Sequence, residues 1–264
     1  MLVTASSDST LKVWDLIEGE GKLALKERTT FRPPFLLGRC CMAFSPDGKR
    51  LAAAGGQEVK LWDLSTGREL ASHKLRVNVW SSVALSPDLR TLAAPNFQDV
   101  DLWDLTPGKE RTPLLDHRGV VWCVAFTGDG RTLVVGSHRT EEGGQFIGEV
   151  KLWDLAAGKG RVVLKDRPAF LRELALSPDG RLLVLQEEER PSGAGELKLL
   201  ALPSGRVLGN VPFKGGRDLP RSLALGANGK VLAAGYFDGT VRLWDVIPPQ
   251  SSKGPEGRGG VSGK

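Results

Sequence analysis

Histidine and cysteine are the side chains whose spacing most readily indicates chemistry, and both are scarce in this sequence. Histidines grouped with acidic residues would indicate a metal site or a general base, and a Cys-x-x-Cys pair would indicate zinc or thiol chemistry. The three histidines and three cysteines of the 264 residues show neither spacing: His73, His117, His138, Cys40, Cys41 and Cys123. The sequence therefore predicts no metal, no cofactor and no disulfide framework.

Segments that carry nucleophilic or phosphate chemistry are also missing from the sequence. There is no Gly-x-Ser-x-Gly segment, which would present a nucleophilic serine on a sharp turn. Gly229-Lys230 lacks both the upstream glycine and the following Ser or Thr of a phosphate-binding loop. We therefore expect a protein that is not an enzyme, with the alternative that it is an accessory domain or a fragment of a larger multidomain enzyme.

Tryptophan–aspartate pairs recur through the chain and reveal a repeat. They begin at Trp14, Trp62, Trp103, Trp153 and Trp244, which are separated by 48, 41, 50 and 91 residues. The last interval spans two periods, because residues 197–202 copy the pattern at its midpoint with Leu200 in place of tryptophan. The chain therefore contains six units of a length that is typical of propeller blades.

Two kinds of turn keep step with these pairs. Segments of the Ser-Pro-Asp-Gly type precede each pair from the second onward, at residues 45–48, 86–89, 127–130, 177–180 and 226–229. A glycine follows five residues after each of the first five positions, at Gly19, Gly67, Gly108, Gly158 and Gly205. Such residues favour tight turns, and the segments between them alternate or run apolar over four to six positions, as strands do. We therefore expect each complete unit to have four strands, named a to d in chain order, with the Trp-Asp pair on strand c.

The fold class that follows is all-β, a β-propeller built of four-stranded antiparallel blades. The propeller should span residues 1–247, with units at about 1–28, 39–75, 77–116, 119–166, 169–214 and 219–246. Residues 248–264 are rich in glycine and polar residues, which predicts a disordered tail.

The first and last units are incomplete, because the first lacks strand a and the last lacks strand d. These two pieces overlap and cannot complete one blade between them. Either six blades close with two defective neighbours, or the chain is a fragment of a longer propeller or multidomain protein, and we expect the fragment.

With these motifs, residues 1–246 resemble the WD-repeat family. In that family the strand-c tryptophan joins a hydrogen-bonded set with an Asp of the b-to-c turn, a Ser or Thr of strand b and a His before strand a. Partial sets occur in three units of this chain: Thr4, Asp8 and Trp14; His117 and Trp153; Asp238 and Trp244. The resemblance implies a non-catalytic scaffold that binds other proteins.

In a propeller, the b-to-c and d-to-a loops open on one face. The b-to-c connections are long and mostly acidic in the fourth unit, residues 137–149, and in the fifth, residues 186–196. We expect an acidic lip there that grips a basic peptide or domain with the help of nearby aromatic residues. The predicted partner-binding residues are Trp80, His117, Trp122, His138, Arg139, Glu141, Glu142, Phe146, Glu187, Glu188, Glu189, Arg190 and Tyr236. The alternative is that these polar loops have no binding role.

The opposite face carries a cation after nearly every turn, at Lys49, Arg68, Arg90, Lys109, Arg131, Lys159, Arg181, Arg206 and Lys230. With a pI of about 9.2, this pattern leaves binding of nucleic acid or another acidic ligand as an alternative function. The cations are spread singly and no aromatic residues interleave them for base stacking, so we do not expect nucleic acid to be the partner. Alternatively, these lysines and arginines only keep the protein soluble and were duplicated together with each repeat.

Composition and the N-terminus give an expected location. The sequence is 41% hydrophobic and 25% charged, which is ordinary for a folded globular protein. It has no apolar run of about 18 residues that could span a bilayer, and residues 1–10 lack the pattern of a secretion signal. We expect a cytoplasmic protein that does not bind membranes.

Overall fold

The computed structural model describes residues 2–5, 10–19, 22–31, 41–45, 47–79, 82–105, 112–114, 119–189, 192–226 and 229–246. Within these ranges the regular structure is β-strand, apart from one short 3-10 helix, η1, at Gly216–Asp218. No helix of the described residues is long and apolar enough to cross a membrane. Predicted positions outside these ranges include Trp80, Lys109, His117, Arg190 and the tail at residues 248–264.

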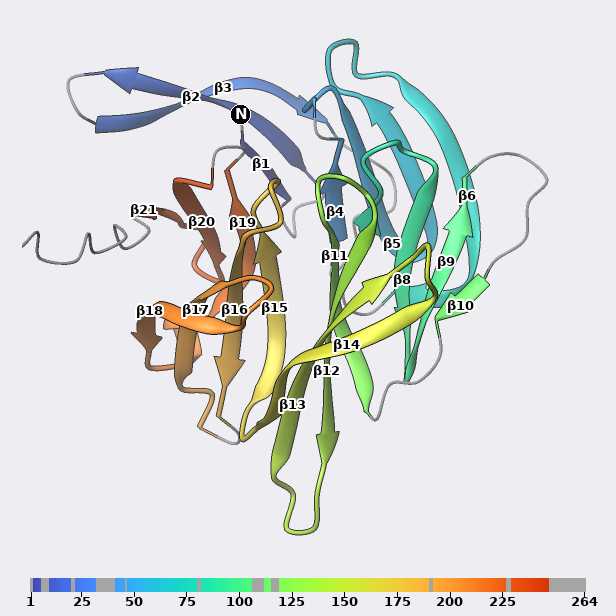
Figure 1. The fold of residues 1–264 in the computed structure, drawn as a ribbon. Coiled ribbons are helices and arrows are strands. Elements are labelled where there is room, and N and C mark those ends of the chain that lie inside the picture. Colours follow the sequence, from blue (N-terminus) through green and yellow to red (C-terminus); the bar gives the residue numbers. More distant parts are fainter. Residues whose placement is uncertain are drawn as a thin grey trace, which may run out of the picture.

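The strands of the described residues form six separate antiparallel sheets in chain order (Figure 1). The first sheet holds β1 (Leu2–Ala5), β2 (Leu11–Gly19) and β3 (Lys22–Phe31), and the second holds β4 (Cys41–Phe44), β5 (Arg50–Asp63) and β6 (Glu69–Val79). The third holds β7 (Ala84–Leu85), β8 (Thr91–Asn96), β9 (Asp99–Asp104) and β10 (Thr112–Leu114).

The fourth sheet consists of β11 (Val120–Phe126), β12 (Thr132–Thr140), β13 (Phe146–Asp154) and β14 (Lys159–Arg167). The fifth consists of β15 (Phe170–Leu176), β16 (Leu182–Glu188), β17 (Gly195–Ala201) and β18 (Arg206–Phe213), and the sixth of β19 (Pro220–Leu225), β20 (Val231–Tyr236) and β21 (Val241–Asp245). In the described residues the first sheet shows strands b, c and d, and the sixth shows a, b and c. The predicted fold class, all-β with small antiparallel sheets of the kind found in propeller blades, is confirmed.

A repeated backbone hydrogen bond joins the residue before strand b to the residue after strand c, at the open end of the b–c hairpin. In the fourth sheet Leu155 N donates to Arg131 O at 3.0 Å, and in the fifth Leu202 N donates to Arg181 O at 2.8 Å. The same bond joins Leu64 N to Lys49 O at 2.8 Å, across the two ends of β5. The long strand β5 therefore folds back on itself and contains both strand b and strand c of its unit.

The Ser-Pro-Asp-Gly segments form the turns between strands a and b. In the fifth sheet, Ser177 Oγ donates to Asp179 Oδ1 at 2.5 Å and accepts a bond from Leu182 N at 2.9 Å. Gly180 completes this turn with φ of 69°, a left-handed conformation that glycine adopts without strain. Three other turns repeat the hydroxyl–carboxylate bond, at Ser45–Asp47, Ser86–Asp88 and Thr127–Asp129. Because these bonds are local in sequence, the turns form where the motif occurs.

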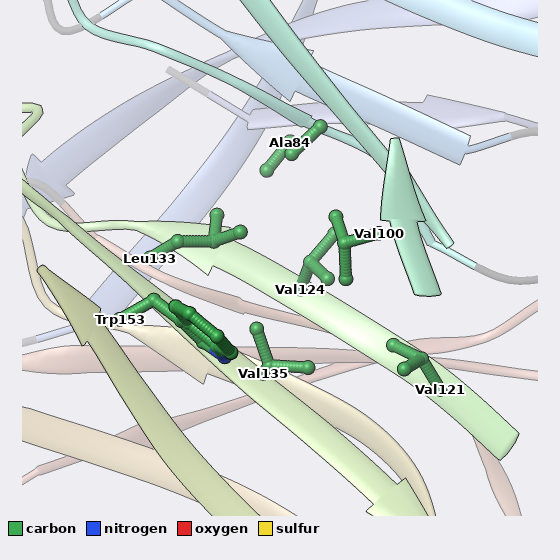
Figure 2. Packing of buried hydrophobic residues seen from close by; sticks show 8 residues of the cluster. Ala84, Val100, Val121, Val124, Leu133, Val135 and Trp153 are labelled. Atoms are coloured by element: carbon green, nitrogen blue, oxygen red, sulfur yellow. The ribbon is translucent and has the colours of Figure 1, made fainter. Parts of the chain in front are cut away.

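The core lies between the sheets rather than within them. One apolar cluster joins each sheet to the next, in five successive interfaces from the first sheet to the sixth. At the third interface, Val100 packs with Val121 and Val124, and Trp153 lies beside Leu133 and Val135 (Figure 2). Leu200, which replaces tryptophan in the fifth unit, is 1% exposed in the fourth interface. Each sheet has two apolar faces, so the sheets are stable only when stacked.

The a strands of neighbouring sheets contact one another: β7 of the third sheet contacts β11, β11 contacts β15, and β15 contacts β19 of the sixth sheet. Figure 1 shows β11 and β15 running side by side near the middle of the molecule. The sheets therefore stack with their a strands inward, as blades do. Among the described residues, no apolar cluster joins the sixth sheet to the first.

Candidate functional site

The b-to-c hairpins of the fourth and fifth sheets end on one side of the molecule, where β12–β13 projects from the lower edge of Figure 1. The predicted loops are shorter than expected from the sequence. Strand β12 continues to Thr140 and β13 begins at Phe146, while β16 continues to Glu188 and β17 begins at Gly195. The loop boundaries at residues 137–149 and 186–196 were wrong because the backbone ladders continue into them, as far as Thr140 opposite Phe146 and Glu188 opposite Gly195.

An aromatic cluster lies where these two sheets meet, made of Trp122, His138, Phe146 and Phe170. The ring centroids of His138 and Phe170 are 4.2 Å apart, and Trp122 meets Phe170 edge-on at 5.1 Å. Phe146 contacts both His138 and Phe170 at 5.3 Å. The cluster draws on strands a, b and c of the fourth sheet and on strand a of the fifth, so it fixes the angle between the two sheets. Three of its members were predicted for the site, and Phe170 was not.

A β-bulge in strand a sets the direction of Trp122. The register of β11 with β12 shifts between Val121 and Cys123, so Trp122 is the extra residue. The same shift occurs at Arg172 in β15 and between Pro220 and Ser222 in β19. Bulges re-aim side chains at strand ends. The fourth, fifth and sixth sheets therefore each have a bulge that redirects one side chain at the same end of strand a.

Two of the predicted lip carboxylates are buried instead of exposed. Glu187 accepts hydrogen bonds from Arg167 Nε and Nη2, both at 3.0 Å, and from Lys198 Nζ at 2.6 Å. Glu188, 2% exposed, pairs with Arg172 of the adjacent strand β15. The bond to Glu187 also raises the pKa of Arg167. Because these carboxylates are neutralised and buried, they do not form the surface that the sequence predicted.

The exposed carboxylates of the two hairpins are Glu141, Glu142 and Glu189. Arg139 is held between Glu141 Oε1 at 2.9 Å and Asp166 Oδ1 at 3.1 Å. That hydrogen bond lowers the pKa of Asp166, so its carboxylate stays ionised. Glu142 and Glu189 have no ion-pair partner within the described ranges. Within the described residues of the two hairpins, three exposed carboxylates therefore stand against one cation that is not buried, Arg139.

Phe97 is a candidate site residue that sequence reasoning missed. It stands at the tip of the β8–β9 hairpin of the third sheet, 80% exposed, with φ of 53°. Its carbonyl oxygen accepts a hydrogen bond from Val121 N at 2.6 Å, which places the tip beside the start of β11. The signal in the sequence was an aromatic residue in a two-residue turn, where Gly or Asn is usual.

Tyr236, the predicted site residue of the sixth sheet, lies apart from this cluster at the end of β20. Its ring is 9% exposed and lies under the guanidinium of Arg242, 4.1 Å from the ring centroid. The next residue, Phe237, is 73% exposed at the tip of the b-to-c hairpin, with the Arg221 guanidinium over its ring. The structure thus brings Trp122, His138 and Phe146 together but does not bring Tyr236 to them.

On the opposite face, the repeated cations that the structure describes are all exposed: Lys49, Arg68, Arg90, Arg131, Lys159, Arg181, Arg206 and Lys230. A turn carboxylate stands two residues before the cation in four turns, as Asp179 does before Arg181. The cations are therefore interspersed with negative charge rather than gathered into a basic patch.

In the described part of the chain, no group of three or more His, Cys, Asp or Glu side chains is arranged to hold a metal ion. Cys123 is a free thiol in the core, and burial raises its pKa well above the usual value. A buried thiol of that kind remains protonated and inert as a nucleophile.

Comparison with known families finds matches to the WD domain, G-beta repeat, at residues 1–15, 38–63, 108–140 and 213–245. A search of curated proteins found no match. One feature of the family's hydrogen-bonded set is present in the first sheet, where Trp14 Nε1 donates to Thr4 Oγ1 at 2.9 Å. Asp8 and His117, the other polar members noted in the first and fourth units, lie outside the described residues.

Proposed function

Because the chain belongs to the WD-repeat family, we propose that it is a non-catalytic scaffold that binds a basic segment of a partner protein. The binding surface is formed by the b-to-c hairpins of the third, fourth and fifth sheets. WD repeats in general mediate protein–protein interaction, which supports the scaffold role.

The observation that carries the proposal is the charge of the exposed hairpin residues. Glu141 and Glu142 lie in the β12–β13 turn, which leads into the half-buried Phe146, and Glu189 follows the last residue of β16. An apolar centre with a charged rim is the usual composition of a protein interface. The rim carboxylates attract a basic segment and speed its association, while the rings supply most of the binding energy.

Pairing within the chain supports this choice of surface. Glu187 and Glu188 are already bound to oppositely charged neighbours, so their charges are committed to the fold. The exposed Glu141 shares the single cation Arg139 with Asp166, so that group keeps one negative charge in excess. Glu142 and Glu189 have no ion-pair partner among the described residues, so pairing with a lysine or arginine of a partner breaks no ion pair between those residues. A partner with positive charge fits them.

The test uses a random peptide library displayed on phage and selected on the immobilised full chain. Selected peptides should carry net positive charge. The triple variant Glu141→Lys, Glu142→Lys, Glu189→Lys should lose their binding, because it replaces attraction with repulsion. The matched control Glu27→Lys, Glu69→Lys, Asp245→Lys makes the same change in net charge at exposed positions outside these hairpins and should bind normally. Neutral or acidic selected peptides, or equal losses in both variants, would contradict the proposal.

The proposal includes a cytoplasmic location. The odd number of cysteines and the free, buried thiol of Cys123 support it, because extracellular domains more often use cysteines as disulfides. Microscopy of the chain fused to a fluorescent protein at its C-terminus tests this location, and signal confined to a membrane-bound compartment would contradict it.

A further inference from the structure

Phe97 combines two features that a folded chain ordinarily avoids. Its ring is 80% exposed at the tip of a hairpin, and its backbone lies in the left-handed region, at φ of 53°, where residues with a Cβ are strained. Glycine or asparagine would relieve the strain and remove the apolar surface together. Neither feature contributes packing within the described chain.

The surrounding hairpin holds this strained conformation in place. Asn96, the residue before Phe97, donates from Nδ2 to Asp101 Oδ2 at 3.2 Å, and Asp101 is fully buried in β9. The Phe97 carbonyl is tied to Val121 N of the fourth sheet at 2.6 Å. The hairpin is thus braced by its own sheet and by the next one, so the ring is presented from a fixed backbone.

The neighbours of Phe97 connect it to the proposed binding surface. Val120, at the start of β11, is 36% exposed and pairs with His138 of the aromatic cluster. Trp122 follows two residues later and packs into the same cluster. The bond from Val121 N therefore places Phe97 beside the start of β11, the strand that carries Val120 and Trp122.

We infer that Phe97 is the apolar anchor of this surface and that it contacts an apolar side chain within the basic segment of the partner. The inference rests on the proposed function and specifies the chemistry of the partner: positive charges for Glu141, Glu142 and Glu189, and a large apolar side chain for Phe97. A ring carried by a backbone that is held before binding loses less conformational freedom on complex formation than one on a flexible loop, which favours affinity. The strain at Phe97 is retained because binding uses the ring.

The test measures the affinity of the tightest basic peptide from the library for four full-length variants, by fluorescence anisotropy. Phe97→Asn keeps a residue that tolerates positive φ but removes the ring, and it should weaken binding by at least about tenfold. Phe97→Tyr keeps a ring and should bind within about twofold of the parent protein. Phe237→Asn removes the other exposed hairpin ring, on the sixth sheet, and should also bind within about twofold. The fourth variant is the triple lysine variant described above.

The outcomes separate this inference from the proposed function. If the triple lysine variant loses binding while Phe97→Asn keeps it, the anchor role of Phe97 is overturned and the acidic surface stands. If the selected peptides are not basic, both are overturned. Replacing Phe97 by the photo-crosslinking residue p-benzoylphenylalanine adds a direct readout: the crosslink should fall on an apolar residue of the peptide, and a crosslink only to the peptide termini would contradict the inference.

Discussion

Glu187 on β16 binds Arg167, the last residue of β14 in the preceding sheet, through two parallel hydrogen bonds of 3.0 Å. The same carboxylate accepts from Lys198 on β17, whose ammonium also meets Glu196 at 2.7 Å. The fourth and fifth sheets are therefore joined by a polar network at the b-to-c end, in addition to the apolar cluster that fills their interface. Phe170 of the aromatic cluster follows Arg167 by three residues, so the network and the cluster lie close together along the chain.

We predict that Glu187→Ala lowers the free energy of unfolding by about 3 kcal/mol, because it removes the buried carboxylate that binds both Arg167 and Lys198 and leaves Lys198 with Glu196 alone. Glu189→Ala, two residues further along and exposed, should change stability little. Urea denaturation followed by tryptophan fluorescence measures both. Equal free energies of unfolding for the two variants would show that the ion pairs of Glu187 do not stabilise the folded protein.

Gly160 on β14 faces the indole of Trp153, and a Cβ at this position would lie 2.9 Å from Cε2 of the ring. We predict that Gly160→Ala lowers the free energy of unfolding by about 1 to 3 kcal/mol, because the buried indole must move away. Gly209→Ala on β18 is the matched control, since a Cβ there has no heavy atom within 4 Å. Thermal unfolding compares the two, and a stable Gly160→Ala would mean that the indole has room to move.

Phe97→Gly should raise the free energy of unfolding by about 1 kcal/mol, since it removes the strain of a positive φ at a residue with a side chain. Phe237→Gly, also at an exposed hairpin tip but without a positive φ, should lower it by about 0.5 to 1 kcal/mol through the added flexibility of the unfolded chain. Urea denaturation gives both values. If both substitutions change the free energy of unfolding in the same direction, Phe97 is not strained. A gain in stability together with a loss of binding is the combination expected for a residue kept for recognition.

Asp63, of the second Trp-Asp pair, should make stability depend on pH in acid. Hydrogen bonds from the Ser65 hydroxyl and the backbone N–H groups of Thr66 and Ser65 lower its pKa from 3.8 to about 2. Because the folded pKa is the lower one, the stabilisation is complete above pH 3.8 and is lost as the pH falls towards 2. Asp63→Asn should flatten the stability curve between pH 4 and pH 2, as measured by urea denaturation at a series of pH values. An unchanged slope would mean that these bonds do not favour the charged form.

The binding surface shows where sequence reasoning reached its limit. The pattern placed Trp122, His138 and Phe146 near one another because all three belong to one unit, whose strand order was readable. Phe170 could have been found by aligning the units, since it starts strand a of the fifth unit as Val120 starts that of the fourth. The loop boundaries were wrong because acidic residues were interpreted as loop, whereas Glu187 and Lys198 occupy strands as a buried pair.

What the sequence determined alone is the order of strands and turns. The Ser177–Asp179 turn and the alternation of apolar residues around Trp153 depend on neighbours a few positions away, so their physics is contained in the local sequence. What only the tertiary structure decided is the environment of each charged or exposed side chain. Glu187 is neutralised by Arg167, twenty residues earlier on another sheet, and Phe97 is held in a strained turn by a bond to Val121. Burial and pairing depend on which sheets meet and at what angle, and the packing of many side chains sets that angle together.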